Sequence, residues 1–160
     1  MKILAIDPGL TQSGWVVFDG RRVLKSGISD NADLVLEMRC REIVDGRHVV
    51  AIEMVDHYGM PVGKDVFETC VWIGRFMEAQ PRPEEVLRLP RKDVKLELCG
   101  TARAKDANVR QALIDRVGAP GTKRNPGPTY GVKGHIWSAL AVAVCVADQI
   151  GLPKRSCDGR

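Results

Sequence analysis

The chain begins with a short apolar run that ends in a single carboxylate. Residues 2–7 read Lys-Ile-Leu-Ala-Ile-Asp, and Pro8-Gly9 follows directly. A run this short, rich in branched residues and closed by a turn dipeptide, predicts a buried β-strand that carries Asp7 at its end. A buried carboxylate is unfavourable unless it is hydrogen-bonded or holds a cation. Asp7 is therefore either a turn-capping side chain or part of a cation site.

The residues after this turn predict an antiparallel start to the sheet. Gly14 opens a second apolar run that ends at Phe18, and Asp19-Gly20 is a strong hairpin signal. We expect a third strand over about residues 21–28.

A second carboxylate ends another apolar run. Residues 48–54 read His-Val-Val-Ala-Ile-Glu-Met, with Glu53 near the end. A helix predicted over residues 30–45 separates this run from the hairpin, so it can pair in parallel with the Asp7 strand. That pairing places Asp7 and Glu53 side by side at the carboxyl edge of the sheet. Two such acids repel each other, and a divalent cation relieves the repulsion; the alternative is that Glu53 is an ordinary edge charge.

The middle of the chain predicts a loop, a helix and a last strand. Tyr58 lies in the turn-rich segment 56–63, where it can stack on a base or pack against the domain. A helix over about residues 64–79 is expected to turn Phe67 and Val71 inward, with Trp72 in the core. Residues 85–89 predict a short strand stopped by Pro90.

From Arg91 onward the sequence becomes basic. Two short helices joined by Gly100-Thr101, and a loop over residues 118–134, can present a positive surface to a phosphate backbone. Interleaved acids such as Asp93 and Asp106 leave a solvated helix pair as the alternative. The candidate nucleic-acid contacts are Arg91, Lys92, Lys95, Arg103, Lys105, Lys123, Arg124 and Lys133, together with Tyr58.

The closing helix is predicted over residues 135–150 and is apolar nearly all round, as expected for a helix buried against a sheet. Its polar groups near the start are His135 and Ser138, which are three residues apart and so share one face. His135 is either a metal ligand or general base, or an exposed histidine of the first turn.

Length, charge and cysteine pattern bound the class of protein. The 160 residues suit one domain, which we expect over residues 1–152, with a basic flexible tail at 153–160. The formal net charge of +4 permits nucleic-acid binding. Five cysteines without CxxC pairing suit reduced thiols in the cytoplasm. The longest apolar run is about half a membrane span, so we expect no membrane partner.

Four segments together resemble the RuvC-type Holliday junction resolvases of the ribonuclease H-like superfamily, in the shorter versions carried by phages and prophages. They are Ala5-Ile-Asp7-Pro-Gly9 with Gly14, Ala51-Ile-Glu53, Val94-Lys95 through Val109, and Ser138-Ala-Leu-Ala141. The resemblance implies an α/β fold with a five-stranded mixed sheet, its first three strands antiparallel, flanked by helices. It also implies a homodimer and cuts that leave 5′-phosphate and 3′-hydroxyl ends.

The family's first two acids fall on Asp7 and Glu53, but the closing helix departs from the family pattern. The family usually has two acids where this chain has His135 and Ser138. His135 can replace the first as a ligand, and Ser138 can hydrogen-bond a metal-bound water; the exchange shifts preference from Mg²⁺ towards Mn²⁺. Lys95 matches a family lysine near DNA, whereas a second such position falls on Asp106, with Lys105 beside it.

We therefore expect a metal-dependent endonuclease for Holliday junctions or other branched DNA, a crossover junction endodeoxyribonuclease in the cytoplasm, or in the host cytosol if a phage encodes it. Two Mg²⁺ or Mn²⁺ ions would share Asp7, with Glu53 and His135 completing one site each. One alternative is a non-catalytic branched-DNA-binding relative, which Ser138 favours. Another is a phosphotransferase of the sugar-kinase and actin superfamily, whose phosphate-binding hairpin the Asp7 segment also resembles. A flap or fork nuclease is the third.

Overall fold

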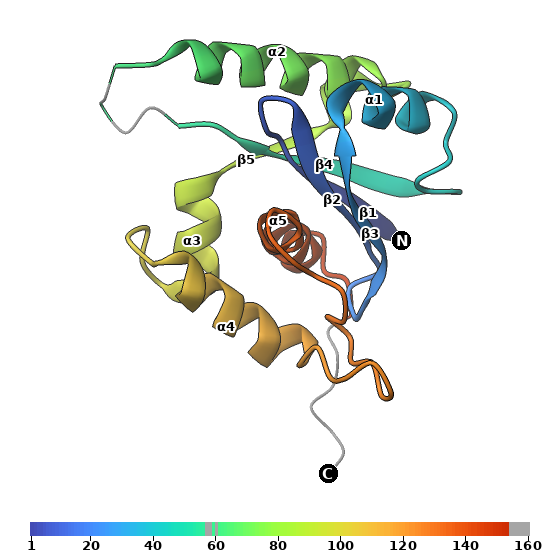
Figure 1. Cartoon of the computed structure of the whole chain (residues 1–160), viewed down its shortest axis with the longest axis vertical. Coiled ribbons are helices and arrows are strands. Elements are labelled where there is room, and N and C mark those ends of the chain that lie inside the picture. Colours follow the sequence, from blue (N-terminus) through green and yellow to red (C-terminus); the bar gives the residue numbers. More distant parts are fainter. Residues whose placement is uncertain (57–58, 60, 154–160) are drawn as a thin grey trace.

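The fold is a five-stranded mixed sheet covered by helices on both faces (Figure 1). The computed structural model describes residues 1–56, 59 and 61–153. The strands are β1 (Lys2–Asp7), β2 (Gln12–Phe18), β3 (Val23–Asp30), β4 (His48–Met54) and β5 (Leu87–Pro90). Their order in the sheet is β3-β2-β1-β4-β5, in which β1 to β3 are antiparallel and β4 and β5 run parallel to β1. The sequence prediction of the sheet is confirmed.

The two faces of the sheet build two separate layers of core. Ile3 and Ala5 of β1 pack against α5 (Ile136–Gln149), whereas Leu4 and Ile6 pack on the opposite face. This alternation is the pattern of a strand buried on both sides. In Figure 1, α1 (Asn31–Arg39) and α2 (Lys64–Glu78) lie above the sheet and α5 lies beneath it. Helices α3 (Arg91–Cys99) and α4 (Asp106–Val117) lie beyond α5, as the basic helix pair predicted from the sequence.

Helix α1 is shorter than predicted because a left-handed residue ends it. Its C-cap is Cys40, and Arg41 has a φ of 58°. The N–H of Glu42 donates to the carbonyl of Glu37, and the N–H of Arg41 donates to the carbonyl of Met38. These two bonds form a Schellman motif, in which glycine or asparagine is usual at the left-handed position. An arginine does not mark a helix end in the sequence, so the sequence predicts a helix that continues to residue 45.

The prediction that α2 turns Phe67 and Val71 inward is wrong. Their side chains are 63% and 58% exposed, whereas Ile73 and Phe76 of the same helix are buried. The helix is apolar on more than one side, so its periodicity does not tell which face meets the sheet. Trp72 is half-buried, with the guanidinium of Arg75 over its ring.

Three sequence predictions concern residues outside this description. Tyr58 is one, and the tail over residues 154–160 is another. The fifth cysteine, Cys157, also lies there, while Cys40, Cys70, Cys99 and Cys145 are free thiols. Within residues 1–56, 59 and 61–153, no helix has both the length and the apolar character needed to cross a membrane.

Candidate active site

Two carboxylates meet at the carboxyl edge of the sheet, as the sequence predicts. Asp7 is the last residue of β1, and Glu53 is the penultimate residue of β4. The parallel register aligns Ile6 with Ile52, so Asp7 and Glu53 leave neighbouring strands at the same level. Each residue is only 7% exposed. Both acids have therefore lost most of their hydration and need partners within the protein.

Buried polar side chains hold the turn that follows Asp7. The hydroxyl of Ser13 donates to Asn31 Oδ1 at 2.6 Å and accepts from the N–H of Gly9 at 3.3 Å. Asn31 in turn donates from Nδ2 to the carbonyl of Gly9 at 2.9 Å. Both side chains are buried, and this network fixes the backbone that directly follows Asp7. Ser13 and Asn31 carry no signal of this contact in the sequence, because they lie 18 residues apart.

The start of α5 brings His135 to Asp7. Gly14 pairs with Asp7 across the β1–β2 ladder, and a Cβ on Gly14 would lie 2.7 Å from the carbonyl carbon of His135. Only glycine leaves room for the helix start at this place. His135 is the N-cap of α5, and its Nδ1 lies 3.0 Å from Asp7 Oδ2.

His135 contacts Asp7 directly, and Ser138 lies one turn along the same helix. In the tautomer that carries hydrogen on Nδ1, His135 donates to Asp7 and leaves its Nε2 lone pair available; we assign that tautomer from the contact. The side chain of His135 is 66% exposed, so Nε2 can meet a substrate or a water. The Ser138 hydroxyl, one turn along α5, accepts a hydrogen bond from Arg91 Nη1 at 3.4 Å.

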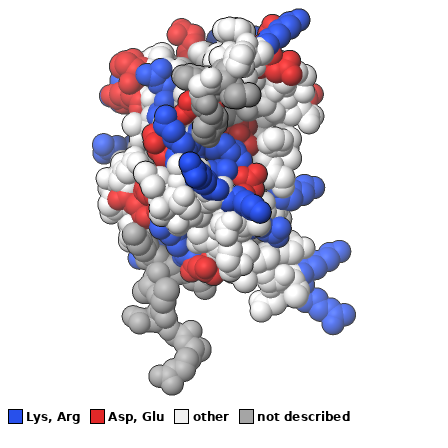
Figure 2. All heavy atoms as spheres, turned by 90° about the vertical axis from the view of Figure 1, so that its left-hand side faces the viewer, with Lys and Arg blue, Asp and Glu red and all other residues white. Residues whose placement is uncertain are grey.

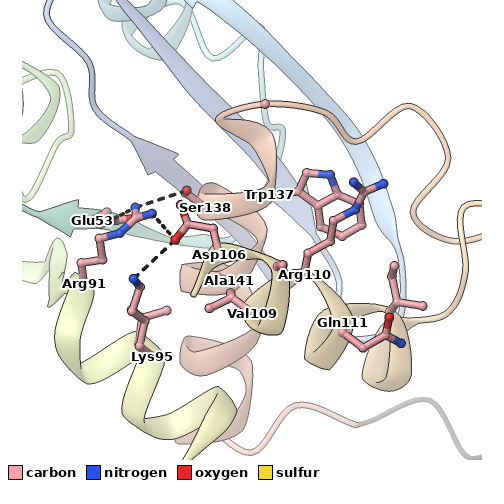
Figure 3. A pocket seen from close by; sticks show the side chains of 14 residues that line it. Glu53, Arg91, Lys95, Asp106, Val109, Arg110, Gln111, Trp137, Ser138 and Ala141 are labelled. Atoms are coloured by element: carbon pink, nitrogen blue, oxygen red, sulfur yellow. Dashed lines mark hydrogen bonds and ion pairs between the residues drawn. The ribbon is translucent and has the colours of Figure 1, made fainter. Parts of the chain in front are cut away.

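Arg91 is the principal cation of the site. It begins α3 directly after β5, and its guanidinium lies between the sheet edge and α4 (Figure 3). Nη1 donates to Glu53 Oε1 at 2.8 Å and to Ser138 Oγ at 3.4 Å, while Nη2 donates to Asp106 Oδ1 at 2.9 Å. The run of basic residues in the sequence predicts that Arg91 lies on a DNA-binding surface. Such a run does not indicate that Arg91 pairs with a buried carboxylate.

Burial dominates the electrostatics of the two edge carboxylates. Burial raises the pKa of Asp7, while the hydrogen bond and charge of His135 and the charge of Arg91 act in the opposite direction. Burial also raises the pKa of Glu53, and the negative charge of Asp7 adds to that rise, against the charge and hydrogen bond of Arg91. Both acids bind a proton more readily than usual, which is the behaviour of a site that lacks positive charge.

Asp106 holds Arg91 from the other side. Burial works to raise the pKa of Asp106, but its hydrogen bonds and charge interactions with Arg91 and Lys95 outweigh it, so the pKa is lowered. Lys95 Nζ lies 3.4 Å from the same Oδ1 atom. The pKa of Arg91 is raised by Glu53 and Asp106 despite its burial, so it is a permanent cation.

A cavity of about 560 Å³ opens beside these residues, between α3, α4 and α5 (Figure 3). Glu53, Arg91 and Ser138 form its polar end, and Val94 and Ile114 are among its apolar lining residues. Trp137 also lines it, with the guanidinium of Arg110 4.9 Å from its ring centre. The carboxylate edge is thus open to a ligand and is not sealed in the core.

The basic residues predicted to contact nucleic acid differ in their exposure and in their pairing with acids. Figure 2 shows Lys and Arg side chains gathered near the middle of the face that lies at the left of Figure 1, with Asp and Glu side chains among them. Lys92 pairs with Asp56 at 2.8 Å. The exposed members are Lys92, Arg103, Lys105, Lys123, Arg124 and Lys133. Of these, Lys123 and Arg124 lie in a hairpin closed by a bridge between Gly121 and Pro126.

The predicted metal ligands lie at one edge of the sheet, but two of them pair with each other and one pairs with Arg91. These pairs are Asp7 with His135, and Glu53 with Arg91. Among the residues that the structure describes, no group of three or more His, Cys, Asp or Glu side chains is arranged to hold a metal ion. The reason is geometric: Glu53 turns to Arg91, and Asp7 turns to His135.

Comparisons with known proteins give a fold relationship. No protein-family model and no curated protein sequence matches the chain. A structure of RuvC from Thermus thermophilus matches with a TM-score of 0.67 and 19% identity, over 96% of this chain and 99% of that chain. RuvC of T. thermophilus in complex with a Holliday junction substrate matches with a TM-score of 0.70 and 18% identity, over 96% of this chain and 98% of that chain. The chain therefore has the fold of the RuvC structures, and the expected fold class is confirmed.

Proposed function

We propose that this protein is a metal-dependent, structure-selective endodeoxyribonuclease that hydrolyses phosphodiester bonds in Holliday junctions or other branched DNA. One observation carries the proposal: Asp7, Glu53, His135 and Ser138 meet at one sheet edge, in a fold shared with a RuvC that was solved with a Holliday junction substrate. Asp7 and Glu53 match the first two acids of the resembled resolvase family, while His135 and Ser138 stand where that family usually has two further acids. We extend that activity to the expected domain, residues 1–152.

The donor set at this edge fits a divalent cation. Asp7 and Glu53 offer carboxylate oxygens and Ser138 offers a hydroxyl, which suit Mg²⁺ and Mn²⁺, while the imidazole of His135 favours Mn²⁺. The two acids are desolvated and have raised pKa values, so a cation at this edge would be stabilised. Bound divalent ions supply Lewis acidity and a more acidic water. From the sequence we expect two ions that share Asp7, with Glu53 and His135 completing one site each.

The chain's own residues set the position of these donors. The Asp7 carboxylate holds the ring of His135, with Nδ1 3.0 Å from Oδ2, so that the two side chains could hold one cation. The network of Ser13 and Asn31 keeps the backbone that follows Asp7 in place. These contacts orient the acid before substrate arrives, which lowers the cost of reaching a reactive geometry.

A track of cations leads DNA to the site. Arg103 and Lys105 are exposed at the turn between α3 and α4, next to the helix that carries Arg91. Lys133 is exposed two residues before His135. Contacts between such side chains and phosphates give sequence-independent affinity that falls steeply with salt. Tyr58 remains a proposed stacking partner for a base.

A homodimer would supply the two active sites that symmetric cutting of a junction needs. The exposed apolar side chains of Phe67 and Val71 on α2 are one turn apart, and Gly74 continues the same face. An exposed apolar stripe of this kind suits a second copy of the same helix, with glycine allowing close approach. We place the dimer interface on this face of α2. We also propose that the protein works in the cytoplasm with reduced thiols, and in the cytoplasm of the bacterial host if a phage encodes it.

A non-catalytic branched-DNA-binding protein is the second candidate. Ser138 stands where the resembled family has an acid, and Arg91 pairs with Glu53. Both features reduce the negative charge available to a divalent cation.

Nicking of a synthetic four-way junction separates the two candidates. The full chain should nick the junction in Mn²⁺, and less rapidly in Mg²⁺, while leaving a linear duplex of the same sequence intact. Asp7→Asn should bind the junction with similar affinity and nick it at background rate. Tight binding without nicking in either metal would support the non-catalytic candidate, and equal cutting of the linear duplex would contradict structure selectivity.

A further inference from the structure

Arg91 stands where a second cation would stand. Its guanidinium bridges Glu53, Ser138 and Asp106 through three hydrogen bonds of 2.8 to 3.4 Å. Its side chain is 34% exposed, so part of it can be reached from the cavity. An arginine held on both sides by carboxylates keeps one position, unlike a lysine on a free surface.

The charges at the edge favour one divalent ion. Asp7 and Glu53 bring two negative charges, and Arg91 returns one positive charge. Ser138 adds none where the resembled family has an acid. Two divalent ions together with Arg91 would place five positive charges against these two carboxylates. One divalent ion together with Arg91 places three positive charges there, and the negative charges of a phosphodiester and of Asp106 compensate the excess.

We propose that Arg91 takes the place of a cation on the Glu53 side, so that the site takes one divalent ion, which Asp7 and His135 would hold. This inference rests on the proposed nuclease function and narrows the two-ion expectation. Arg91 then contacts the scissile phosphodiester, and Asp106 is a positioning residue that keeps the guanidinium turned towards the site. Lys95, which also contacts Asp106, supports the same arrangement.

The guanidinium has the chemistry that this place requires. In the hydrolysis, the water oxygen bonds to phosphorus, the bond from phosphorus to O3′ breaks, and the electron pair stays on O3′. One water proton leaves to solvent, and O3′ is protonated by solvent. Arg91 donates hydrogen bonds to the charge that develops on the departing oxygen or the phosphate, as a second metal ion would do.

Counting bound Mn²⁺ tests the proposal without DNA. Titration of the full chain, by calorimetry and by the loss of free Mn²⁺ signal in electron paramagnetic resonance, should give one ion per chain. Arg91→Met frees Glu53 and should give two. Arg88→Met removes the same charge from an exposed position on β5 and should keep the count at one.

Two ions in the unaltered chain, or one ion in Arg91→Met, would overturn the proposal. If Arg91→Met does not fold, Arg91→Gln takes its place in the comparison. If neither variant folds, the ion count in the unaltered chain decides. Failure of the proposed function is distinguishable, because it shows as absence of junction nicking whatever the ion count. A chain that nicks the junction and binds two ions keeps the function and loses the inference.

Kinetics on the junction supply the second readout. Arg91→Met should lower kcat by about 10²-fold or more, since it removes a donor used in the transition state, with little change in the dissociation constant of the junction. Arg91→Lys should recover part of the rate. Asp106→Asn should lower kcat less and leave the ion count at one. A loss confined to junction affinity would assign Arg91 to the DNA track instead and overturn the proposal.

Discussion

The backbone of His135 occupies the space in which a side chain of residue 14 would stand. A Cβ on Gly14 would lie 2.7 Å from the carbonyl carbon of His135, and Gly14 pairs with Asp7 across the β1–β2 ladder. The distance from the start of α5 to Asp7 therefore depends on a residue that has no side chain. The hydrogen bond between His135 and Asp7 follows from this contact.

Gly14→Ala should damage activity more than its stability cost suggests. The added methyl group meets backbone, which cannot rotate away, so α5 must shift from β2. We expect a loss of about 1–3 kcal/mol in the free energy of unfolding, as for other overpacked positions. Because the shift moves His135 from Asp7, junction nicking should fall by a larger factor than the fraction of folded protein. Urea denaturation and nicking rates on the same samples measure both.

Gly63→Ala is the matched control for this change. A Cβ there meets nothing within 4 Å, and the φ of Gly63 is −82°, which alanine adopts freely. Because Gly63 is the N-cap of α2, where glycine is preferred to alanine, the free energy of unfolding should fall by about 0.5–1 kcal/mol, while the start of α5 stays where it is. If Gly14→Ala nicks junctions like the control, the proposed dependence of the site on this close approach is wrong.

Asp7→Asn should stabilise the metal-free protein at neutral pH. The pKa of Asp7 is raised in the folded state from an ordinary value of 3.8, chiefly by burial, so the unfolded chain gives up the proton more readily. The stability that the protonated carboxyl contributes is present below that ordinary value and is lost as pH rises through the folded pKa. The variant cannot lose it, so its advantage in unfolding free energy should be small near pH 4 and grow towards pH 7.

Urea denaturation in the presence of a chelator, at a series of pH values, measures this difference. Glu53→Gln should behave in the same direction, because burial and the charge of Asp7 raise the pKa of Glu53 as well. An advantage of Asp7→Asn that shrinks with rising pH would mean that contacts with His135 and Arg91 outweigh the burial of Asp7.

Mn²⁺ should stabilise the unaltered chain but not Asp7→Asn. A ligand that binds only the folded state adds stability by mass action, about 2.7 kcal/mol at a hundredfold excess over its dissociation constant. Asp7→Asn takes away a carboxylate that is proposed to hold the cation. Thermal unfolding with and without Mn²⁺, followed by chelation, measures the effect, and NaCl at the same ionic strength serves as a control for general ionic effects. Equal shifts for both proteins would place the binding elsewhere.

Sequence could predict the carboxylates because each is marked by its own strand. Asp7 and Glu53 end apolar runs, and the intervening helix implies the parallel pairing that aligns Ile6 with Ile52. His135 and Ser138 are found from the single polar face of an apolar helix. These signals are local, and chain topology alone brings them together.

The role of Arg91 could not be predicted in this way. Its partners Glu53 and Asp106 come from β4 and α4, and nothing near Arg91 in sequence distinguishes it from Lys92, which pairs with Asp56 instead. The prediction of which face of α2 is buried was wrong for a related reason. Phe67 and Ile73 are equally apolar, and only the position of the sheet decides which one is buried.

The salt dependence of junction binding should distinguish the two ends of the sheet. Arg103→Gln with Lys105→Gln removes two exposed charges near the carboxyl edge. Each phosphate contact that is lost should reduce the slope of log affinity against log salt concentration by about 1. Arg21→Gln with Arg22→Gln removes two exposed charges from the β2–β3 hairpin, at the opposite end of β2 from Gly14, and should leave the slope unchanged. Fluorescence anisotropy over a range of salt concentrations measures it; equal slopes for the two double variants would contradict a localised track.

Phe67→Glu should convert the proposed dimer into monomers. Phe67 is exposed on α2 and contributes nothing to the buried core, so its replacement by a charge should leave the free energy of unfolding of the monomer within about 0.5 kcal/mol. In a helix–helix interface, the same charge would be desolvated without a partner, which costs several kcal/mol and disrupts pairing. Light scattering after size exclusion measures the mass, and Glu68→Gln on the neighbouring exposed position is the control. The monomer should still make single nicks but lose the paired, symmetric cuts that resolve a junction, because each chain carries one Asp7. A Phe67→Glu protein that remains dimeric would place the interface on another face of the molecule.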